Sequence, residues 1–402
     1  VQKPAAGKVG HVVHLEPGMQ PGQTVGQLAR WCVGLHLLFA CRPSTALLVE
    51  RAESDAHSGP IKTEPAFSDI AADSSGPCGY GLRLMAECTA LLYGRGLACG
   101  CWRKVRSLES SGMKASMLQH GNACLLGFSG QVKGLDKFER GTLGYIRDHD
   151  PVLSETVCGS QLARGFVSKA KEMLGLSVWT AFANKLAADG CRGGVTVLGT
   201  SLGGALAEIV AGCANRGQLD ELQGAGLPSF HVDRLFTFGA PPTAVVPIAN
   251  RNSGRKDDEC FPGKRIFLNS PSGSTDLVAY STSLSGYSHA RQDAFQLMEM
   301  PGGNFNVTLH PCKTAETAAV PSWTMIYPAL ERIVRNGGWD VTGELKRYVE
   351  ANHVMDAYLH GLDNTVESPE NNVNIGARLH EQPVSVDPIM AKAVQRIAQC
   401  IA

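Results

Sequence analysis

A stretch of twenty residues, 195–214, constrains the fold of this chain more than any other part of its sequence. Its first four residues are apolar or β-branched, which is typical of a buried strand, and its second half has the alanine-rich spacing of a helix. The sequence Gly-Thr-Ser-Leu-Gly lies between the two halves, at 199–203. A strand that turns sharply into a helix strains the backbone at the turn, and glycines on either side leave space for it. We therefore expect a strand, a tight turn with Ser201 at its apex, and a helix from about 202 to 215.

Such a turn would present the hydroxyl of Ser201 above the edge of a sheet, beside the start of a helix. The backbone N–H of Leu202 would point into the same space, where it could bind the oxyanion that forms during acyl transfer. This strand–turn–helix arrangement of G-x-S-x-G is the nucleophile elbow of serine hydrolases. The alternative is a glycine-rich turn that only allows close packing, and the placement between a strand and a helix favours the elbow.

A serine hydroxyl becomes an effective nucleophile when a base takes its proton and an acid orients that base. In elbow-containing sheets the acid and then the base follow the serine along the chain. Asp276 lies in a polar loop just after the strand expected at 265–268, and loops at that edge of an open sheet collect the functional site. Asp276 is therefore the candidate acid, against the alternative of a turn or cap residue. Spacing alone does not choose the base among the six histidines that follow Ser201, which are His231, His289, His310, His353, His360 and His380.

The remaining patterns predict strands that alternate with helices. Apolar spacing indicates helices at 82–93 and over 161–188, the latter broken near Gly175; strands are expected at 234–239 and 265–268, and a hairpin joins 114–120 to 123–128. Alternation of this kind predicts an α/β fold with a mostly parallel central sheet and helices on both faces. The polar, charged residues 247–263 are expected to form a surface insertion.

The chain is expected to have three segments: an N-terminal extension at 1–78, a catalytic α/β domain at 79–362, and a C-terminal extension at 363–402 with a terminal helix. The N-terminal extension is interpreted as a leader or as partly disordered. Residues 30–46 resemble a secretory leader, and a buried helix fits them equally well. If residues 30–46 act as a leader, we expect the protein to be secreted or to lie in an endomembrane lumen. Otherwise we expect a cytoplasmic location. No apolar run reaches the 18 residues of a membrane-spanning helix.

Charge and cysteine content narrow the class of protein further. Lys plus Arg and Asp plus Glu number 37 each, so nucleic acid is not an expected partner. The 13 cysteines show no zinc-binding spacing, and Cys99 and Cys101 are too close together for it. Buried single cysteines are the default interpretation, with a few disulfides if the protein is secreted. In that case Asn306-Val-Thr308 is also a glycosylation acceptor pattern.

Seven motifs resemble, in order along the chain, those of the class 3 lipases, a family of fungal-lipase-like serine esterases that includes plant phospholipase A1-like enzymes. Three precede or contain Ser201: residues 124–131 resemble a strand that ends in F-R-G-[ST], 163–166 resemble H-x-G-F, and 196–207 resemble T-G-H-S-L-G-G-A-L-A. Four follow it: 236–241 resemble T-F-G-x-P, 275–278 resemble D-x-V, 286–290 resemble Y-x-H-x-G, and 353–360 resemble H-D-M-E-x-Y-L-H.

The resemblance implies an α/β-hydrolase fold and a role for each matched residue. Ser201 would be the nucleophile, Asp276 the acid and His353 the base, with backbone N–H groups of Leu202 and Gln131 as the oxyanion hole. His289 is the runner-up base. It ranks below His353 because its counterpart in the family is usually structural. His360 is expected on the surface of a helix. This chemistry requires no metal or organic cofactor, and none is predicted.

The chain departs from the family pattern at three positions near the serine. Thr200 replaces a histidine, Ser129 an arginine, and Gln131 a threonine or serine whose hydroxyl would add an oxyanion donor. Residues 133–160 are mostly polar and show no clear amphipathic lid helix, so activation at a lipid–water interface stays open.

The resemblance implies a lipid ester as substrate, either a triacylglycerol or the sn-1 ester of a phospholipid. Small esters, such as the feruloyl type found in plants, are an alternative. A different class of protein also fits: a degenerate relative that binds a lipid or a partner without turnover. The sequence leaves the oligomeric state open.

Overall fold

The computed structural model describes residues 78–94, 99–110, 112–130, 154–187, 189–250, 260–269, 275–280, 287–300, 302–312, 329, 332–333, 336 and 341–365. The chain divides into two compact units, and every described residue lies in the unit formed by Asp55–Ser385 with Ile397–Ala402. The segment boundaries expected at 78 and 362, and the terminal helix, therefore stay predictions. None of the helices in the described part is both long and apolar enough to span a membrane.

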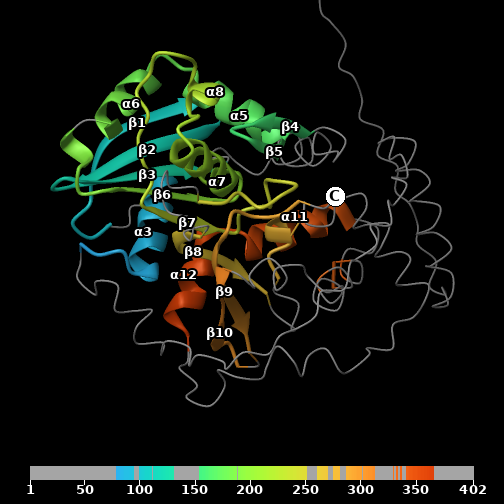
Figure 1. The fold of residues 1–402 in the computed structure, drawn as a ribbon. Helices are drawn as coiled ribbons and strands as arrows, with labels where there is room; N and C mark the ends of the chain where they lie inside the picture. Colours follow the sequence, from blue (N-terminus) through green and yellow to red (C-terminus); the bar gives the residue numbers. More distant parts are fainter. Residues whose placement is uncertain are drawn as a thin grey trace, which may run out of the picture. The chain divides into compact units, whose positions relative to one another are not determined.

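The described residues are built around a sheet of eight strands in the order β1-β2-β3-β6-β7-β8-β9-β10 (Figure 1). The strands are β1 (Arg103–Ser110), β2 (Met113–His120), β3 (Ala123–Ser129), β6 (Val195–Thr200), β7 (Arg234–Phe238), β8 (Phe261–Leu268), β9 (Gln292–Glu299) and β10 (Phe305–His310). Five neighbours, from β3 to β9, run parallel. β1 and β2 at one edge and β10 at the other pair antiparallel. The prediction of a mostly parallel sheet is confirmed.

Helices cover both faces of this sheet (Figure 1). One face carries α5 (Arg164–Leu174), α6 (Trp179–Ala187), α7 (Leu202–Asn215) and the short α8 (Asp220–Gln223), and the other carries α3 (Leu82–Leu92) and α12 (Met355–Asp363). Along β3, Cys124 and Leu126 join the core under α7, while Leu125 between them joins the core under α3. All six residues of β6 are buried, as expected of a central parallel strand. This is the α/β-hydrolase architecture.

Smaller elements complete the described unit. β4 (Ser154–Val157) and β5 (Ser160–Ala163) form a separate hairpin, α11 (Val341–Asn352) precedes α12, and η3 (Asp189–Cys191) and η4 (Val278–Tyr280) are single turns. The predicted hairpin is present as β2 and β3. The helical stretch predicted over 161–188 is wrong at its start, because residues 161–163 belong to β5. The remainder is divided into α5 and α6 at Gly175, whose N–H bonds the carbonyl of Lys171 at 2.8 Å.

The surface insertion predicted at 247–263 is wrong at both ends. Ile248 is 2% exposed and packs on α7, where a β-carbon at Gly212 would lie 2.4 Å from its Cγ2. Phe261, also 2% exposed, begins β8. The polar residues between them dominated the composition and concealed the apolar ends. Residues 251–259 lie outside the described part.

The default interpretation of buried single cysteines is wrong for the cysteines that the structure describes, and the alternative of disulfides applies to them. Five disulfides join Cys78 to Cys101, Cys88 to Cys99, Cys124 to Cys191, Cys158 to Cys213 and Cys260 to Cys312. The partners are 11 to 67 residues apart in sequence and meet only through the tertiary fold. The other three cysteines lie outside the described residues.

Candidate active site

Ser201 occupies the turn between β6 and α7, as predicted. Its φ of 56° and ψ of −136° lie in a region that residues with a side chain rarely adopt. Among the described residues, Cys158 is the only other non-glycine with positive φ. The N–H of Ser201 donates to the carbonyl of Phe238 on the neighbouring strand at 3.0 Å. This bond helps to hold the strained turn at the carboxyl edge of the sheet.

The glycines on either side of Ser201 are required by close backbone contacts. A β-carbon at Gly199 would lie 2.3 Å from the carbonyl oxygen of Gly203. A β-carbon at Gly203 would lie 2.3 Å from the carbonyl oxygen of Phe128, at the end of β3. Both distances are far below ordinary contact, so the turn and its packing on β3 depend on the absence of side chains.

Two backbone segments border the Ser201 side chain. Leu202 is the first residue of α7, and an N–H at that position has no acceptor within its own helix. On the other side, a β-carbon at Gly130 would lie 3.1 Å from Ser201 Cβ and 3.4 Å from Oγ. The N–H of Gly130 donates to the hydroxyl of Tyr93 at 2.8 Å. Gln131, the predicted second oxyanion donor, lies outside the described residues, and its role stays a prediction.

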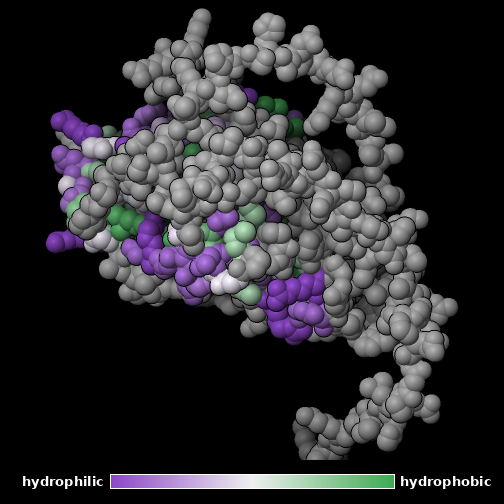
Figure 2. Space-filling model, turned by 90° about the horizontal axis from the view of Figure 1, so that it is seen from below, coloured by the Kyte–Doolittle hydropathy of each residue, from purple (hydrophilic) through white to green (hydrophobic). Residues whose placement is uncertain are grey.

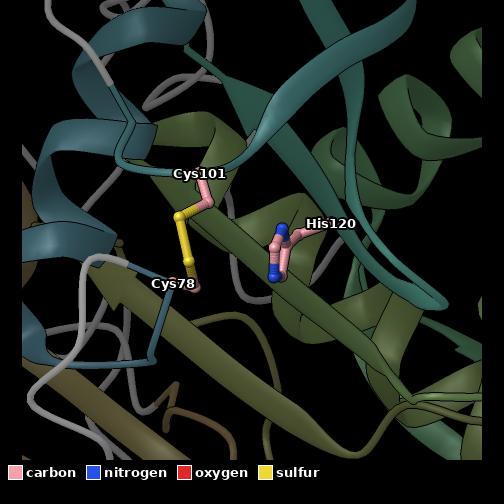
Figure 3. A group of neighbouring side chains, drawn as sticks. All are labelled: Cys78, Cys101 and His120. Carbon is pink, nitrogen blue, oxygen red and sulfur yellow. A yellow bond between two sulfur atoms is a disulfide. The ribbon is translucent and has the colours of Figure 1, made fainter.

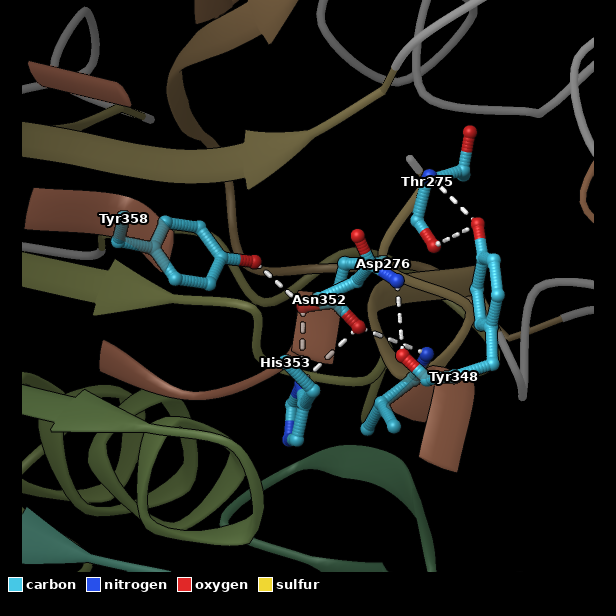
Figure 4. Close-up of polar contacts among 7 residues, drawn as sticks. Thr275, Asp276, Tyr348, Asn352, His353 and Tyr358 are labelled. Atoms are coloured by element: carbon cyan, nitrogen blue, oxygen red, sulfur yellow. Dashed lines mark hydrogen bonds and ion pairs between the residues drawn. The ribbon is translucent and has the colours of Figure 1, made fainter. Parts of the chain in front are cut away.

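Asp276 and His353 form a hydrogen-bonded pair (Figure 4). Nδ1 of His353 lies 2.9 Å from Oδ1 and 2.8 Å from Oδ2 of Asp276. The carboxylate is completely buried, and the imidazole is 11% exposed. Because a carboxylate accepts hydrogen bonds, Nδ1 carries the proton and Nε2 carries the lone pair that a base needs.

The acid–base pair packs against the same strand end that holds Ser201. Asp276 follows β8, and its N–H bonds the carbonyl of Leu268 at 3.1 Å. Gly239 follows β7, next to the residue that bonds Ser201, and has a φ of +56°. A β-carbon at Gly239 would lie 2.4 Å from Asp276 Oδ2 and 3.2 Å from His353 Nδ1. Gly239, the residue after the one that bonds Ser201, therefore packs against both Asp276 and His353.

Nε2 of His353 is buried and has no hydrogen-bond partner within the described part of the chain. It therefore makes no hydrogen bond to the hydroxyl of Ser201 in this structure. In enzymes without substrate this bond is commonly long, and it shortens when the substrate is bound. Asp276 and His353 are thus in bonding contact, and His353 Nε2 makes no hydrogen bond to Ser201.

His289, the runner-up base, is paired with a different carboxylate. Its Nδ1 lies 3.0 Å from Glu208, which is fully buried on α7 and also accepts bonds from the Thr243 hydroxyl and the Ala290 N–H. Burial lowers the pKa of His289, and the positive charge of Arg265 lowers it further. Glu208 follows Ser201 by seven residues, about 10 Å along the helix. This pair lies in the core beneath the elbow.

Two further groups of side chains have structural surroundings. His360 is exposed on α12, as expected, and hydrogen bonds to Asn364. Cys78, Cys101 and His120 form a group with metal-ligand spacing in the described part of the chain, their ligand atoms lying within 4.8 Å of one another (Figure 3). The two sulfurs are bonded to each other, whereas a metal binds thiolates. We therefore interpret this group as a disulfide beside a histidine.

The sequence analysis missed three tyrosines that contact the site. Tyr93 bonds Gly130 beside the serine, Tyr358 donates a hydrogen bond to Asp276, and Tyr348 bonds the backbone of Thr275. Tyr358 belongs to the motif at 353–360, where it follows His353 by five residues. That spacing was the available signal for a contact between Tyr358 and the site, but whether the contact forms depends on how α12 packs.

Comparison with known proteins gives structural matches alone. No protein-family model matches the sequence, and no curated protein does. Lipase II from Rhizopus niveus matches with a TM-score of 0.42 and 16% identity, over 66% of this chain and 94% of that one. The Rhizomucor miehei lipase–propeptide complex matches with a TM-score of 0.41 and 15% identity, over 62% of this chain and 78% of that one. The lipase from Rhizopus microsporus var. chinensis matches with a TM-score of 0.40 and 18% identity, over 67% of this chain and 88% of that one. At these identities the likeness concerns the fold.

Proposed function

We propose that this chain is a serine carboxylic-ester hydrolase that acts on lipid esters. One observation carries the proposal. Ser201 lies at a strained strand–helix turn whose N–H bonds Phe238, and the buried Asp276–His353 pair packs against the next residue, Gly239. A serine with positive φ beside an ordered carboxylate–imidazole pair matches the requirements for nucleophilic acyl transfer.

The proposed reaction has two halves. In the first, His353 Nε2 accepts the proton of Ser201, whose Oγ attacks the ester carbonyl while backbone N–H groups bind the oxyanion. His353 then donates the proton to the leaving alcohol, and an acyl-enzyme remains. In the second, His353 removes a proton from water, which attacks the acyl group; the carboxylic acid leaves and the Ser201 hydroxyl is restored. Asp276 stays ionised and stabilises the imidazolium.

A lipid substrate is supported by a pair of exposed apolar residues in the loop after β7. Among the described residues the exposed large apolar side chains are Val105, Val178, Val245 and Val246. Val245 and Val246 are adjacent, 37% and 62% exposed, and lie in the loop that follows β7 and Gly239. The coloured surface in the view of Figure 2 is mostly hydrophilic, with smaller hydrophobic areas. We propose that this valine pair contacts the lipid surface during hydrolysis.

The disulfides support a location where thiols are oxidised. Five disulfides within the described residues are unusual for a protein that folds in a reducing cytosol. Of the two locations that the sequence left open, we propose secretion or an endomembrane lumen.

Hydrolysis of p-nitrophenyl esters by the wild type and by Ser201→Ala tests the reaction. We expect the wild type to be active and the variant to lose at least about 1000-fold in kcat/KM. Labelling with a fluorophosphonate should modify Ser201, and His353→Ala should prevent it, whereas His289→Ala should not. Equal activity of wild type and Ser201→Ala would contradict the proposal. An inactive wild type that binds lipid would favour the non-catalytic alternative instead.

Substrate class is tested by comparing triacylglycerol emulsions, sn-1-labelled phospholipid and feruloyl esters. We expect the highest kcat/KM on a long-chain lipid ester. Val246→Asp should lower the rate on emulsified ester and leave the rate on a soluble butyrate ester unchanged. Val178→Asp is the matched control, since Val178 is 48% exposed and lies between α5 and α6. Equal effects of the two substitutions would contradict a role for the valine pair at the lipid surface.

A further inference from the structure

The carboxylate of Asp276 is held by a phenol as well as by the imidazole. The hydroxyl of Tyr358 donates a hydrogen bond to Oδ2, the oxygen that lies 2.8 Å from His353 Nδ1 (Figure 4). Oδ1 accepts a bond from the N–H of Val278 at 2.9 Å. Asp276 and Tyr358 are both 0% exposed. Each oxygen therefore has a protein donor besides the histidine.

Tyr358 is a donor at every pH at which the enzyme could work. Burial raises the pKa of the Tyr358 phenol well above its usual value, and the negative charge of Asp276 raises it further. The phenol therefore stays protonated, and its O–H donates a hydrogen bond to the carboxylate oxygen. A hydrogen bond to a charged group is stronger than one between neutral groups, and more so in a buried site.

Tyr348 provides a comparison because it contacts the neighbouring residue but not the carboxylate. Its hydroxyl accepts a bond from the N–H of Thr275 at 2.7 Å and donates one to the carbonyl of the same residue at 3.0 Å (Figure 4). Tyr348 lies on α11 and Tyr358 on α12, with His353 in the turn between the helices. One segment of the chain thus carries the base and a tyrosine on either side of it.

We propose that Tyr358 is a positioning residue that fixes the Asp276 carboxylate and sets the proton affinity of His353. For catalysis this inference rests on the proposed function. The donated hydrogen bond draws negative charge away from Oδ2, which weakens the attraction of Asp276 for the imidazolium form of His353. Without the hydroxyl, Asp276 would hold the imidazolium more strongly, and His353 would stay protonated to a higher pH.

The tyrosines beside Asp276 do not change charge in the same range. Tyr280, Tyr348 and Tyr358 face the carboxylate from η4, α11 and α12, and burial raises the pKa of each phenol. All three are neutral in acid and at neutral pH. The acid side of a pH–rate profile therefore reports the coupled Asp276–His353 pair.

The first test is the pH dependence of kcat/KM for a soluble ester, in the wild type, Tyr358→Phe and Tyr348→Phe. We expect Tyr358→Phe to lose about 10-fold in kcat with little change in KM. Its acid limb should move up by about 0.5 to 1 pH unit. In Tyr348→Phe the limb should stay at the wild-type pH, because its hydroxyl does not touch the carboxylate. Equal shifts in the two variants, or a wild-type profile in Tyr358→Phe, would overturn the proposal.

The second test does not depend on activity. The imidazole of His353 is titrated by NMR in protein labelled at histidine, with the signal assigned by comparison with His353→Asn. Tyr358→Phe should raise the midpoint of this titration, and 3,5-difluorotyrosine at position 358, a stronger donor, should lower it. A midpoint that neither change moves would overturn the inference even if the chain hydrolyses esters. A chain that hydrolyses none, with both shifts present, would overturn the proposed function and leave this inference standing. Should Tyr358→Phe fail to fold, the fluorinated protein alone decides the outcome.

Discussion

A methyl group at Gly239 would enter the space that the acid–base pair occupies. The added β-carbon of Gly239→Ala would lie 2.4 Å from Asp276 Oδ2, 2.6 Å from the Tyr358 hydroxyl and 3.2 Å from His353 Nδ1. Ordinary contact begins at 3.4 Å, so the carboxylate would have to retreat by about 1 Å. The rest of the site, including Ser201, would keep its place on β6 and α7.

The expected cost is mainly catalytic. A misplacement of about 1 Å in a reacting group can lower the rate about 100-fold, which is the loss we expect in kcat/KM. Alanine at a φ of +56° also strains the backbone, at a cost of about 1 to 2 kcal/mol in the free energy of unfolding. The two effects are separable, because strain changes the stability and displacement changes the rate.

Gly121→Ala is the matched control for strain. Gly121 has a φ of +55°, lies in the turn between β2 and β3, and has no atom within 4 Å of an added β-carbon. Urea unfolding should show a similar loss of stability in both variants, and kcat/KM on a p-nitrophenyl ester should fall in Gly239→Ala alone. Full activity in folded Gly239→Ala, or an equal loss in Gly121→Ala, would refute the reasoning.

Three other predictions concern stability and modification. Glu208→Gln should lower the free energy of unfolding by about 3 kcal/mol, because it removes one partner of a buried pair, while the folded fraction keeps its activity; urea unfolding at pH 7 with an ester assay measures both. Burial and the charge of Arg265 lower the pKa of His310 to about 4, so the unfolded chain binds this proton more tightly than the folded one. Stability should therefore fall by about 3 kcal/mol from pH 6.5 to 4, and unfolding curves of His310→Gln should show a smaller fall. Asn306 is partly exposed on β10, at the edge of the sheet, and a eukaryotic secretory host should attach a glycan there; an endoglycosidase shift in the wild type but not in Asn306→Gln would show it, and no shift would contradict it.

The parts of the fold that depend on local pattern could be predicted from the sequence. β6 and α7 follow from an apolar run, a glycine-flanked serine and an alanine-rich helix, all contiguous along the chain. The hairpin of β2 and β3 follows from two apolar runs around a two-residue turn. In each case the residues that determine the element are its own, so the prediction needed no long-range information.

The features that were missed depend on residues distant in sequence. Cys124 and Cys191 are 67 positions apart, and their pairing requires β3 to lie beside η3. Ile248 is buried because Gly212 leaves a gap on α7, which no local pattern shows. Tyr358 has a role beyond packing only because its hydroxyl contacts Asp276, which lies 82 positions earlier in the sequence. What could be predicted from the sequence was therefore limited by contacts between distant residues, and not by weak local patterns.

The candidate site combined the two kinds of information. Ser201 follows from the turn alone, and Asp276 from its place after a predicted strand. His353 could not be chosen by spacing, and the resemblance to a family motif selected it over His289. The structure pairs His353 with Asp276 and His289 with Glu208, which agrees with that choice of partner. Their roles in a reaction remain for the experiments above.

The base differs from the other two residues in how it reaches the site. Ser201 and Asp276 follow β6 and β8, so they are positioned as soon as the sheet forms. His353 comes from outside the sheet, in the turn before α12, and is placed correctly only when that helix has packed on its face of the sheet. The bond from Tyr358 to Asp276 joins the same helix to the acid. A contact that orients the carboxylate thus also holds the helix that delivers the base, so the packing of α12 fixes the orientation of the acid and the position of the base together.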